Sequence, residues 1–288
     1  MNAPRSTGLP GLDAQSDFLR ARRRATAARL ISRLRFEPDD VDVILPYEEV
    51  IQALGFVSER SVGLKVVPLD AIVGTVDRGR DFDRRFRPTS ARVRTRWERI
   101  AEAMRRGESM PPVDLLKVGE IYFVRDGHNR ISVARALGRT DIDAYVTEVI
   151  TRVDADRAIK LTDLPLKSHE RVFFERVPLP EDARREISFT DPWNFTVLAE
   201  SVEAWGFRLV QQEREPLGRH DTARLWLEHE YRPVVAMLRE ADLIRKSTDA
   251  EAYLRVAAER YRLLRTHVWN DEVLQRVIEG SSHKAMGL

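Results

Sequence analysis

The stretch FVRDGHNRISVARALG, residues 123–138, places five residues with polar or turn-forming chemistry between two apolar segments: Asp126, Gly127, His128, Asn129 and Arg130. If the preceding IYFV is a strand and residues 128–137 form a helix, the free amides of the first helical turn point outward. That end of a helix also carries positive potential, which favours a bound phosphate. The pattern therefore predicts a phosphate cradle at this junction.

Each residue of the cradle has an expected role. Asp126 can cap the helix, and Gly127 permits a positive φ and the close approach of a ligand. His128 and Asn129 can hydrogen-bond a phosphate or a sugar, and Arg130 can grip an anion with two parallel bonds. Ser132 lies in the same opening turn. The alternative is an ordinary Asp-Gly turn whose neighbours face water.

A local excess of arginine lies upstream of the cradle. Eleven arginines and four acidic residues lie between Arg78 and Arg106, although the whole chain of 288 residues has a formal net charge of only +2. Such a segment favours a polyphosphate or nucleic-acid partner. We expect Arg85 and Arg87, in the predicted loop DRGRDFDRRFRP, to assist at the phosphates.

The elements around the cradle predict a small α/β unit over residues 61–150. VGLKVVPLDAIVG predicts a strand and a turn, and the segment ending in RWERIAEAMRRG predicts a helix with Ile100 and Met104 on one side. VDLLKVGEIYFV predicts a hairpin that turns at Val118-Gly119. After the helix that ends at Gly138, DIDAYVTEV predicts a final strand.

The N-terminal 60 residues predict a disordered tail over 1–15 and a helical arm over 16–60. The arm's first helix is expected to start at Ser16 and to pack through a narrow apolar stripe: Leu19, Ala27, Leu30, Ile31 and Leu34. The alternative is a basic arm that binds nucleic acid or a partner. LPYEEVIQALGF predicts a second, short helix ended by Gly55.

Residues 151–288 predict a mostly helical region. One helix is expected to start at Asp191-Pro192 and end at Gly206, another to be kinked by Pro233, and a third to begin with a capping box of Thr248 and Glu251. A last helix is expected to start at Asn270. Five aromatic residues predict helix packing in preference to a stacking surface: Trp226, Tyr231, Tyr253, Tyr261 and Trp269.

Composition excludes several classes of site. Cysteine is absent, so disulfides, thiolate metal sites and cysteine nucleophiles are excluded. The remaining histidines lack the spacing of a metal site: His169, His220, His229, His267 and His283. There is no run of 18 apolar residues and no apolar segment typical of a signal peptide, so we expect a cytoplasmic protein that does not enter a membrane.

The ordered segments VVPLDAIV, RWERIAEAMRRGESMPPVDLLKV, EIYFVRDGHNRISVARALG and IDAYVTEV resemble the ParB/sulfiredoxin superfamily over about residues 64–150. The resemblance implies an α+β fold, with the basic helix before it and the helical region after it. It also implies that a nucleotide triphosphate, with Mg²⁺, binds through its phosphates at the turn of residues 126–130.

The branches of this superfamily differ at the turn. Sulfiredoxins use a cysteine where this chain has His128, which excludes their chemistry here. Partitioning proteins bind and hydrolyse CTP with the residues G-E-R-R where this chain has DGHNR, and carry a helix-turn-helix that residues 151–210 do not show. Free-serine kinases use an acidic base near the first strand, a position for which Asp70, Asp77 and Glu120 are candidates.

The sequence therefore predicts a protein that binds a nucleotide, CTP or ATP, and acts as a regulatory or DNA-associated switch. If the protein is an enzyme with this ligand, we expect it to hydrolyse the nucleotide triphosphate. We expect the helical region to form a homodimer, pack on the domain or bind a partner. One alternative is a DNA-binding regulator without nucleotide chemistry, whose arginines contact the phosphate backbone. The other is a kinase of the same fold that acts on a small molecule such as a free amino acid.

Overall fold

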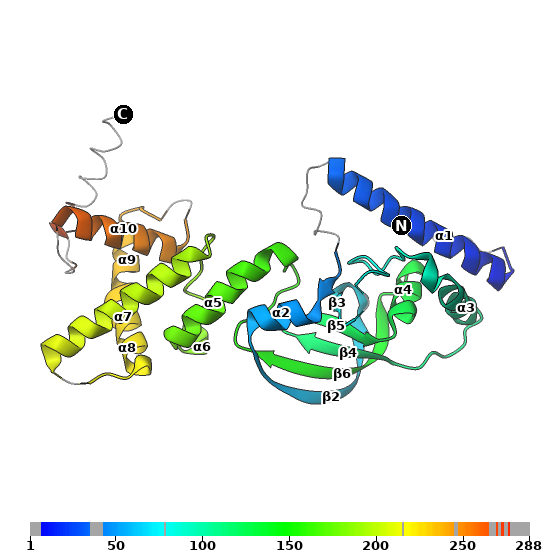
Figure 1. Cartoon of the computed structure of the whole chain (residues 1–288), viewed down its shortest axis with the longest axis horizontal. Coiled ribbons are helices and arrows are strands. Elements are labelled where there is room, and N and C mark those ends of the chain that lie inside the picture. The colour runs from blue at the N-terminus through cyan, green and yellow to red at the C-terminus, as the bar shows by residue number, and fades with distance from the viewer. Residues whose placement is uncertain are drawn as a thin grey trace. The chain divides into compact units, whose positions relative to one another are not determined.

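The computed structural model describes residues 7–34, 43–77, 79–214, 216–244, 247–264, 269, 272, 273 and 276. The chain forms two compact units, divided between Ser168 and His169. The first unit contains a six-stranded mixed sheet with helices, and the second is helical (Figure 1). The predicted mixed α/β fold with a C-terminal helical region is confirmed at this level.

The sheet has the strand order β1-β3-β5-β4-β6-β2. Its strands are β1 (Leu45–Pro46), β2 (Phe56–Pro68), β3 (Ile72–Thr75), β4 (Val113–Val118), β5 (Ile121–Asp126) and β6 (Asp141–Thr151). β1 pairs with β3, β3 with β5 and β4 with β6 in parallel, whereas β4–β5 and β2–β6 are antiparallel. The predicted hairpin and final strand are confirmed. The sheet also takes in β1 and the start of β2, which lie in the segment predicted as the N-terminal arm.

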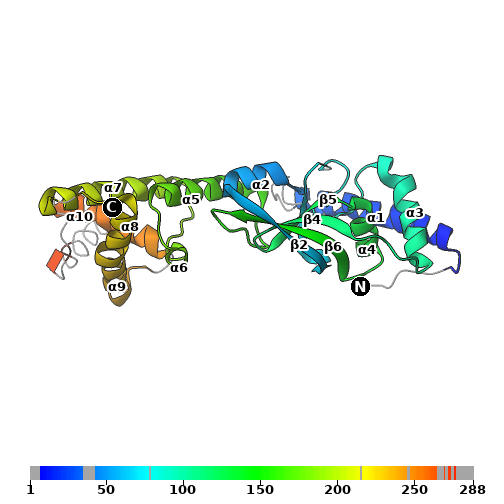
Figure 2. The same ribbon diagram turned by 90° about the horizontal axis from the view of Figure 1, so that it is seen from below.

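Helices α1 (Pro10–Leu34), α2 (Tyr47–Leu54), α3 (Arg94–Arg105) and α4 (His128–Ala136) complete the first unit. Trp97 and Ala101 of α3 and Ile131 and Ala134 of α4 are fully buried in one core cluster with side chains of the sheet. Figures 1 and 2 show α1, α3 and α4 lying together, in agreement with the packing of α3 against both other helices. As predicted, α2 ends at Gly55, which has a φ of 77°.

Helix α1 packs on α3 through a different stripe from the predicted one. Ala14, Phe18, Ala21 and Ala25 are buried, at intervals of three or four residues. The predicted stripe is wrong: Leu19 is 43% exposed, Leu30, Ile31 and Leu34 are more exposed still, and Ala27 also faces solvent. Small side chains let the two helices approach closely, which the larger leucines would prevent.

Two buried aspartates fix the position of α1. Asp17, 3% exposed, accepts hydrogen bonds of 2.9 and 2.5 Å from Nε and Nη2 of Arg105 on α3. Asp13 lies 3.7 Å from Arg105 Nη1, and the ring of Phe18 meets that of Trp97 edge to face at 5.5 Å. The helix starts at Pro10, not at Ser16. The predicted tail over 1–15 is therefore wrong for residues 10–15, while residues 1–6 lie outside the described part.

The helical unit contains α6 (Glu181–Arg184), α7 (Trp193–Glu213), α8 (Arg219–Trp226), α9 (Arg232–Glu240) and α10 (Asp249–Leu264); α5 (Leu164–Arg176) contains the division point. Trp226, Tyr231 and Tyr253 are buried together, which confirms these three as core, whereas Tyr261 is 46% exposed. Trp269 is partly buried and donates to Glu230. The predicted helix at Asn270 lies mainly outside the described residues.

Two predicted features of the helical unit are corrected or refined. α7 continues through Gly206 to Glu213, because Gly206 is buried and packed against Thr222, where a Cβ would lie 2.4 Å from Thr222 Cγ2. The predicted kink at Pro233 takes the form of a π-helical turn over Leu227–Tyr231, directly before α9. The capping box is confirmed: Thr248 N donates to Glu251 Oε2 at 3.0 Å, and Glu251 N to Thr248 Oγ1 at 3.2 Å.

No helix in the described residues has the length and apolar character needed to cross a bilayer.

Candidate functional site

The parallel pairing of β3 with β5 brings the candidate residues together. Thr75, the last residue of β3, pairs with Val124 of β5, so both strands end at the same edge of the sheet. The turn of residues 126–127 follows β5 directly, and α4 begins at His128. This edge is where ligands commonly bind in sheets of this kind.

Both the backbone conformation and the surroundings of position 127 require a glycine. Its φ of 101° lies in the left-handed region. A Cβ at this position would lie 2.4 Å from Val113 Cγ1 and 2.8 Å from Val113 Cβ. The prediction that this glycine adopts a positive φ is confirmed, and the close neighbour is the adjacent strand β4.

His128 is buried, with 4% of its surface exposed. Its Nε2 lies 2.7 Å from Thr75 Oγ1 and 3.9 Å from Asp77 Oδ1. Its ring lies 6.2 Å from that of Phe82, nearly parallel, and 6.3 Å from that of Phe86. The strand end and the loop of residues 82–86 therefore hold the imidazole in one orientation, beside the exposed carboxylate of Asp77.

Asn129 is 5% exposed and has an unsatisfied acceptor. Its Oδ1 is buried and accepts no hydrogen bond among the described residues. A buried acceptor without a partner costs about 1–3 kcal/mol, and such groups in native proteins call for an explanation. Asn129 lies in the first turn of α4, whose backbone amides precede the first hydrogen bond of the helix, from Ile131 N to Gly127 O.

Arg130 forms a clamp within the protein. Its Nη1 donates to the carbonyl oxygens of Pro111 and Pro112 at 2.6 and 2.9 Å, and its Nη2 donates to Asp126 Oδ2 at 2.5 Å. The guanidinium thereby ties the start of α4 to the segment before β4. Arg130 and Asp126, predicted to grip an anion and to cap the helix, instead bond to each other; no side-chain cap hydrogen bond is made to α4.

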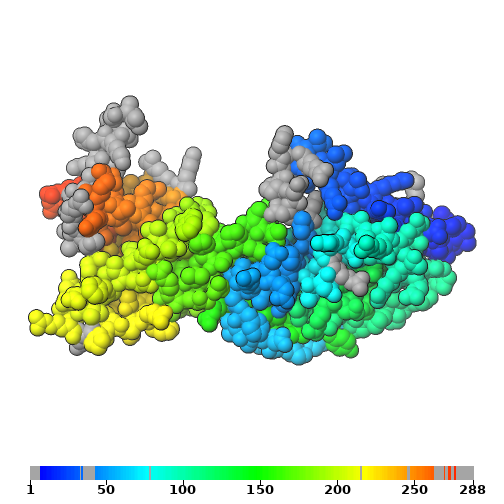
Figure 3. Space-filling view, viewed as in Figure 1, coloured from blue at the N-terminus to red at the C-terminus, as the bar shows by residue number. Residues whose placement is uncertain are grey.

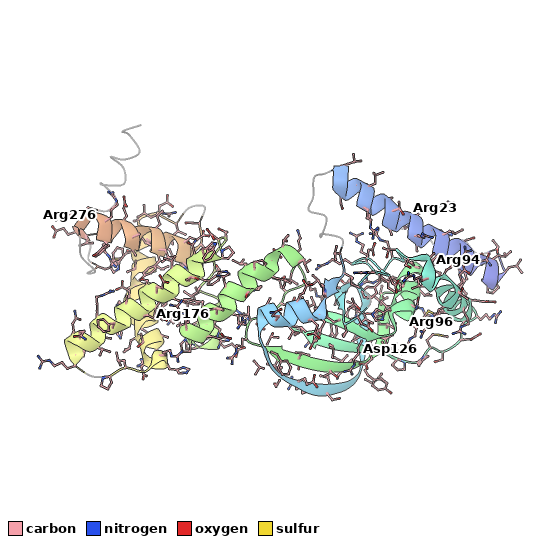
Figure 4. The ribbon with its side chains drawn as sticks, viewed as in Figure 1. Arg23, Arg94, Arg96, Asp126, Arg176 and Arg276 are labelled. Atoms are coloured by element: carbon pink, nitrogen blue, oxygen red, sulfur yellow. The ribbon has the colours of Figure 1, made fainter. Side chains whose placement is uncertain are left out.

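Residues 126–130 line a small cleft of about 20 Å³ together with Arg96 and Ile100 of α3. This volume holds about one water molecule, so a larger ligand would sit at its mouth. Arg96 is exposed and its guanidinium makes no ion pair or hydrogen bond within the described part of the chain. Figure 4 shows Arg96 and Asp126 on the same side of this region.

The structure places the other predicted residues elsewhere. Asp70, Arg85, Arg87 and Ser132 line a second, larger cleft, which shares no lining residue with the small one. Ser132 is buried and accepts a hydrogen bond of 2.8 Å from Trp97 Nε1. Glu120 lies in the β4–β5 turn, at the opposite end of β5 from Asp126 and about 20 Å away at the rise of a strand.

Two residues of this region were missed by the sequence analysis. Thr75 holds His128, and Arg96 adds an exposed cation to the lining of the small cleft. Thr75 ends an apolar strand, but only the pairing of β3 with β5 shows that it meets His128. Arg96 lies within the arginine-rich segment, and that surplus was the only signal for it.

No family model, no curated protein and no solved structure matches the chain. Across the residues that the structure describes, no group of three or more histidine, aspartate or glutamate side chains is arranged to hold a metal ion.

Proposed function

We propose that the chain binds a nucleotide triphosphate, with the phosphates at the first turn of α4, as the resemblance to the ParB/sulfiredoxin superfamily implies. The observation that carries the proposal is the buried, unsatisfied Asn129 Oδ1 beside the amides that precede the first helical bond, from Ile131 N to Gly127 O at 3.0 Å. Amides at this position favour phosphate oxygens. The carboxamide oxygen requires a donor, such as a ribose hydroxyl or a water on a bound cation.

The surrounding side chains have distinct roles in this proposal. Arg96 offers a free cation at the mouth of the small cleft. Arg130 positions the turn through its bonds to Pro111 and Pro112. Of the three candidate bases, Asp77 lies nearest, with its carboxylate 66% exposed and 3.9 Å from His128 Nε2. In a phosphoryl transfer such a carboxylate would take up the proton of the attacking hydroxyl.

A magnesium ion fits this site only if it binds together with the phosphates. Mg²⁺ usually keeps several waters and is held by one or two carboxylates together with phosphate oxygens. Asp77 is the exposed carboxylate beside His128, and the described residues offer no cage of three carboxylate or imidazole ligands. Bound there, the ion would neutralise phosphate charge.

The first test is calorimetric titration of the full chain with a panel of nucleoside triphosphates. We expect one of them to bind, and Asn129→Leu to abolish that binding. The same substitution removes an unsatisfied acceptor and keeps the branched shape of the side chain, so the free energy of unfolding is expected to stay equal or rise. Loss of binding together with loss of stability would instead indicate a structural role.

A matched pair of variants on α3 provides the control. Arg96 and Arg99 are both exposed and lie one turn apart, but only Arg96 lines the small cleft. We expect Arg96→Ala to weaken nucleotide binding about tenfold, the effect of one charge-assisted bond, and Arg99→Ala to leave it unchanged. Equal effects of both variants, or no binding of any nucleotide, would contradict the proposal.

A further inference from the structure

The larger cleft is lined by residues of α1, the loop before α3, the segment that joins β2 to β3, and α4. It has a volume of about 950 Å³. Eight arginines and three aspartates contribute to its walls, a surplus of five positive charges. They are Arg20, Arg24, Arg84, Arg85, Arg87, Arg135, Arg139 and Arg157, with Asp17, Asp70 and Asp141. Figure 3 shows α1, in blue, resting on the cyan and teal surface of the same unit.

Some of these arginines are fixed in place by the protein. Arg135 donates to the carbonyl oxygens of Leu69 and Ile72, the latter at 2.7 Å, and its Cζ lies 5.3 Å from the centre of the Phe86 ring. Arg84 Nη2 donates to Ile159 O at 2.5 Å, while its Nη1 is buried and has no hydrogen-bond partner in the part of the chain that the structure describes. These side chains form a rigid cationic wall.

Three arginines are available to a ligand. Arg24, Arg85 and Arg139 are exposed, and the side chain of each makes no hydrogen bond or ion pair with the residues that the structure describes. They come from three segments of the chain: α1, the loop before α3, and the turn that follows α4. Arginines that converge in this way suit a ligand with several anionic groups.

The loop that carries Arg85 and Arg87 is built around Asp83. This side chain is 5% exposed and accepts from Arg85 N at 3.0 Å, Arg87 N at 2.9 Å and Arg87 Nε at 2.6 Å. Phe86, between the two arginines, has a φ of 56° and is 1% exposed. A phenylalanine in the left-handed region is strained and persists only where its surroundings fix it.

The cleft also has an apolar side, formed by Ala21, Leu69, Val73, Phe86 and Ala136. Its volume lies in the range of small-molecule sites, and mixed apolar and polar walls are usual in such sites. Sequence-specific binding to duplex DNA would instead require an element that projects into a groove. Concavity and lining therefore favour a compact polyanion with an uncharged ring.

Burial disfavours the charge of one arginine in the cleft. It lowers the pKa of Arg135 to about 10; the charges of Asp83 and Asp70 oppose this shift, and that of Arg85 adds to it. A bound anion would offset the repulsion among the arginines.

We propose that this cleft binds a small polyphosphorylated molecule of the nucleoside polyphosphate class, at a site separate from the first turn of α4. The proposal does not depend on the proposed function, because the two clefts share no lining residue. Arg24, Arg85 and Arg139 contact the phosphates, and the apolar wall contacts the ring.

The test is calorimetric titration of the full chain with inorganic tripolyphosphate, followed by a nucleoside tetraphosphate. Arg85→Ala/Arg139→Ala is the test variant, and Arg92→Ala/Arg99→Ala is the control, because Arg92 and Arg99 are exposed and line neither cleft. We expect the test variant to weaken tripolyphosphate binding about 100-fold, tenfold for each lost contact. The control is expected to bind as the unchanged protein does, and the nucleoside ligand to bind more tightly than tripolyphosphate.

Further arms separate this site from the α4 site and from nucleic acid. Asn129→Leu is expected to leave tripolyphosphate binding in the cleft intact. Circular dichroism of each variant must show an unchanged fold, which the exposure of the substituted arginines favours. Equal losses in the test and control variants would overturn the proposal. The proposal would also be overturned if Arg96→Ala lost tripolyphosphate binding while the test variant kept it. Binding of duplex DNA without binding of either phosphate ligand would overturn it too.

Discussion

Gly127 and Gly138 lie at the two ends of α4 and both have positive φ, but their surroundings differ. A Cβ on Gly127 would overlap Val113, whereas a Cβ on Gly138 would meet nothing within 4 Å. At Gly138 the only cost of a side chain is the strained backbone. At Gly127 the overlap with β4 is added to it, so Gly127 also sets the distance between the turn and the sheet.

We predict that Gly127→Ala lowers the free energy of unfolding by about 3 kcal/mol and Gly138→Ala by about 1 kcal/mol, because only the first adds a steric clash to the left-handed strain. Urea denaturation of both variants measures the difference. A loss at Gly127 no larger than that at Gly138 would mean that β4 moves aside readily.

At the scale of single residues, the sequence was informative about location and less so about contacts. The glycine, its positive φ and the strand–turn–helix junction follow from local rules, and the structure confirms them. Besides Asp126, the partners of Arg130 are carbonyl oxygens 18 and 19 residues away, and His128 meets Thr75 across 53 residues. No local pattern encodes such pairings, since they arise from the packing of the sheet.

At the scale of the elements, α1 shows why a helical stripe can be misjudged. Leucine and isoleucine are the natural candidates for a buried face, yet the buried face consists of Phe18 and three alanines, with Asp17 paired to Arg105. The partner helix α3 determines which face is buried, and it presents both an arginine and the Trp97 ring. Residue type alone does not contain that information.

This correction leads to a paired prediction for adjacent residues. Phe18 is fully buried and Leu19 is 43% exposed. We expect Phe18→Ala to cost about 3–5 kcal/mol of stability and Leu19→Ala less than about 0.5 kcal/mol. Chemical denaturation followed by tryptophan fluorescence reports the change, because Phe18 touches Trp97. A large loss of stability in Leu19→Ala would instead support the apolar stripe predicted from sequence.

Ser132 and Arg135 illustrate a signal that was available at the scale of one element. They lie three residues apart on one face of α4, and both line the larger cleft, as does Arg139 in the segment after Gly138. The arginine surplus pointed to residues 78–106, whereas residues of α1 and α4 also line the cleft. Spacing within a helix would have extended the candidate set, but which segments meet it depends on the tertiary fold.

At the scale of the whole molecule, each compact unit has its own aromatic core. Trp97 and Phe123 are fully buried in the first unit, and Phe195 and Trp226 in the helical unit. Units with separate cores commonly unfold separately. The alternation of strand and helix patterns predicted this organisation in outline, although residues 151–190 gave no periodic signal and contain α5 and α6.

We predict that the full chain unfolds in two thermal transitions. Phe18→Ala should lower the midpoint of one transition and Phe195→Ala that of the other, because each removes a buried ring from a different core. Differential scanning calorimetry of the two variants resolves them. A single transition that both substitutions shift equally would show that the two cores unfold as one cooperative unit.

The loop of residues 82–87 lines the large cleft and packs on one residue of the small cleft. Phe82 and Phe86 pack on His128, which lines the small cleft, while Arg85 and Arg87 line the large one. If an anion in the large cleft changes the position of this loop, the orientation of His128 changes with it. Thermodynamic linkage then requires that each ligand alter the affinity of the other by the same factor. Phe86, with its strained backbone, would thus couple ligand binding in one cleft to ligand binding in the other.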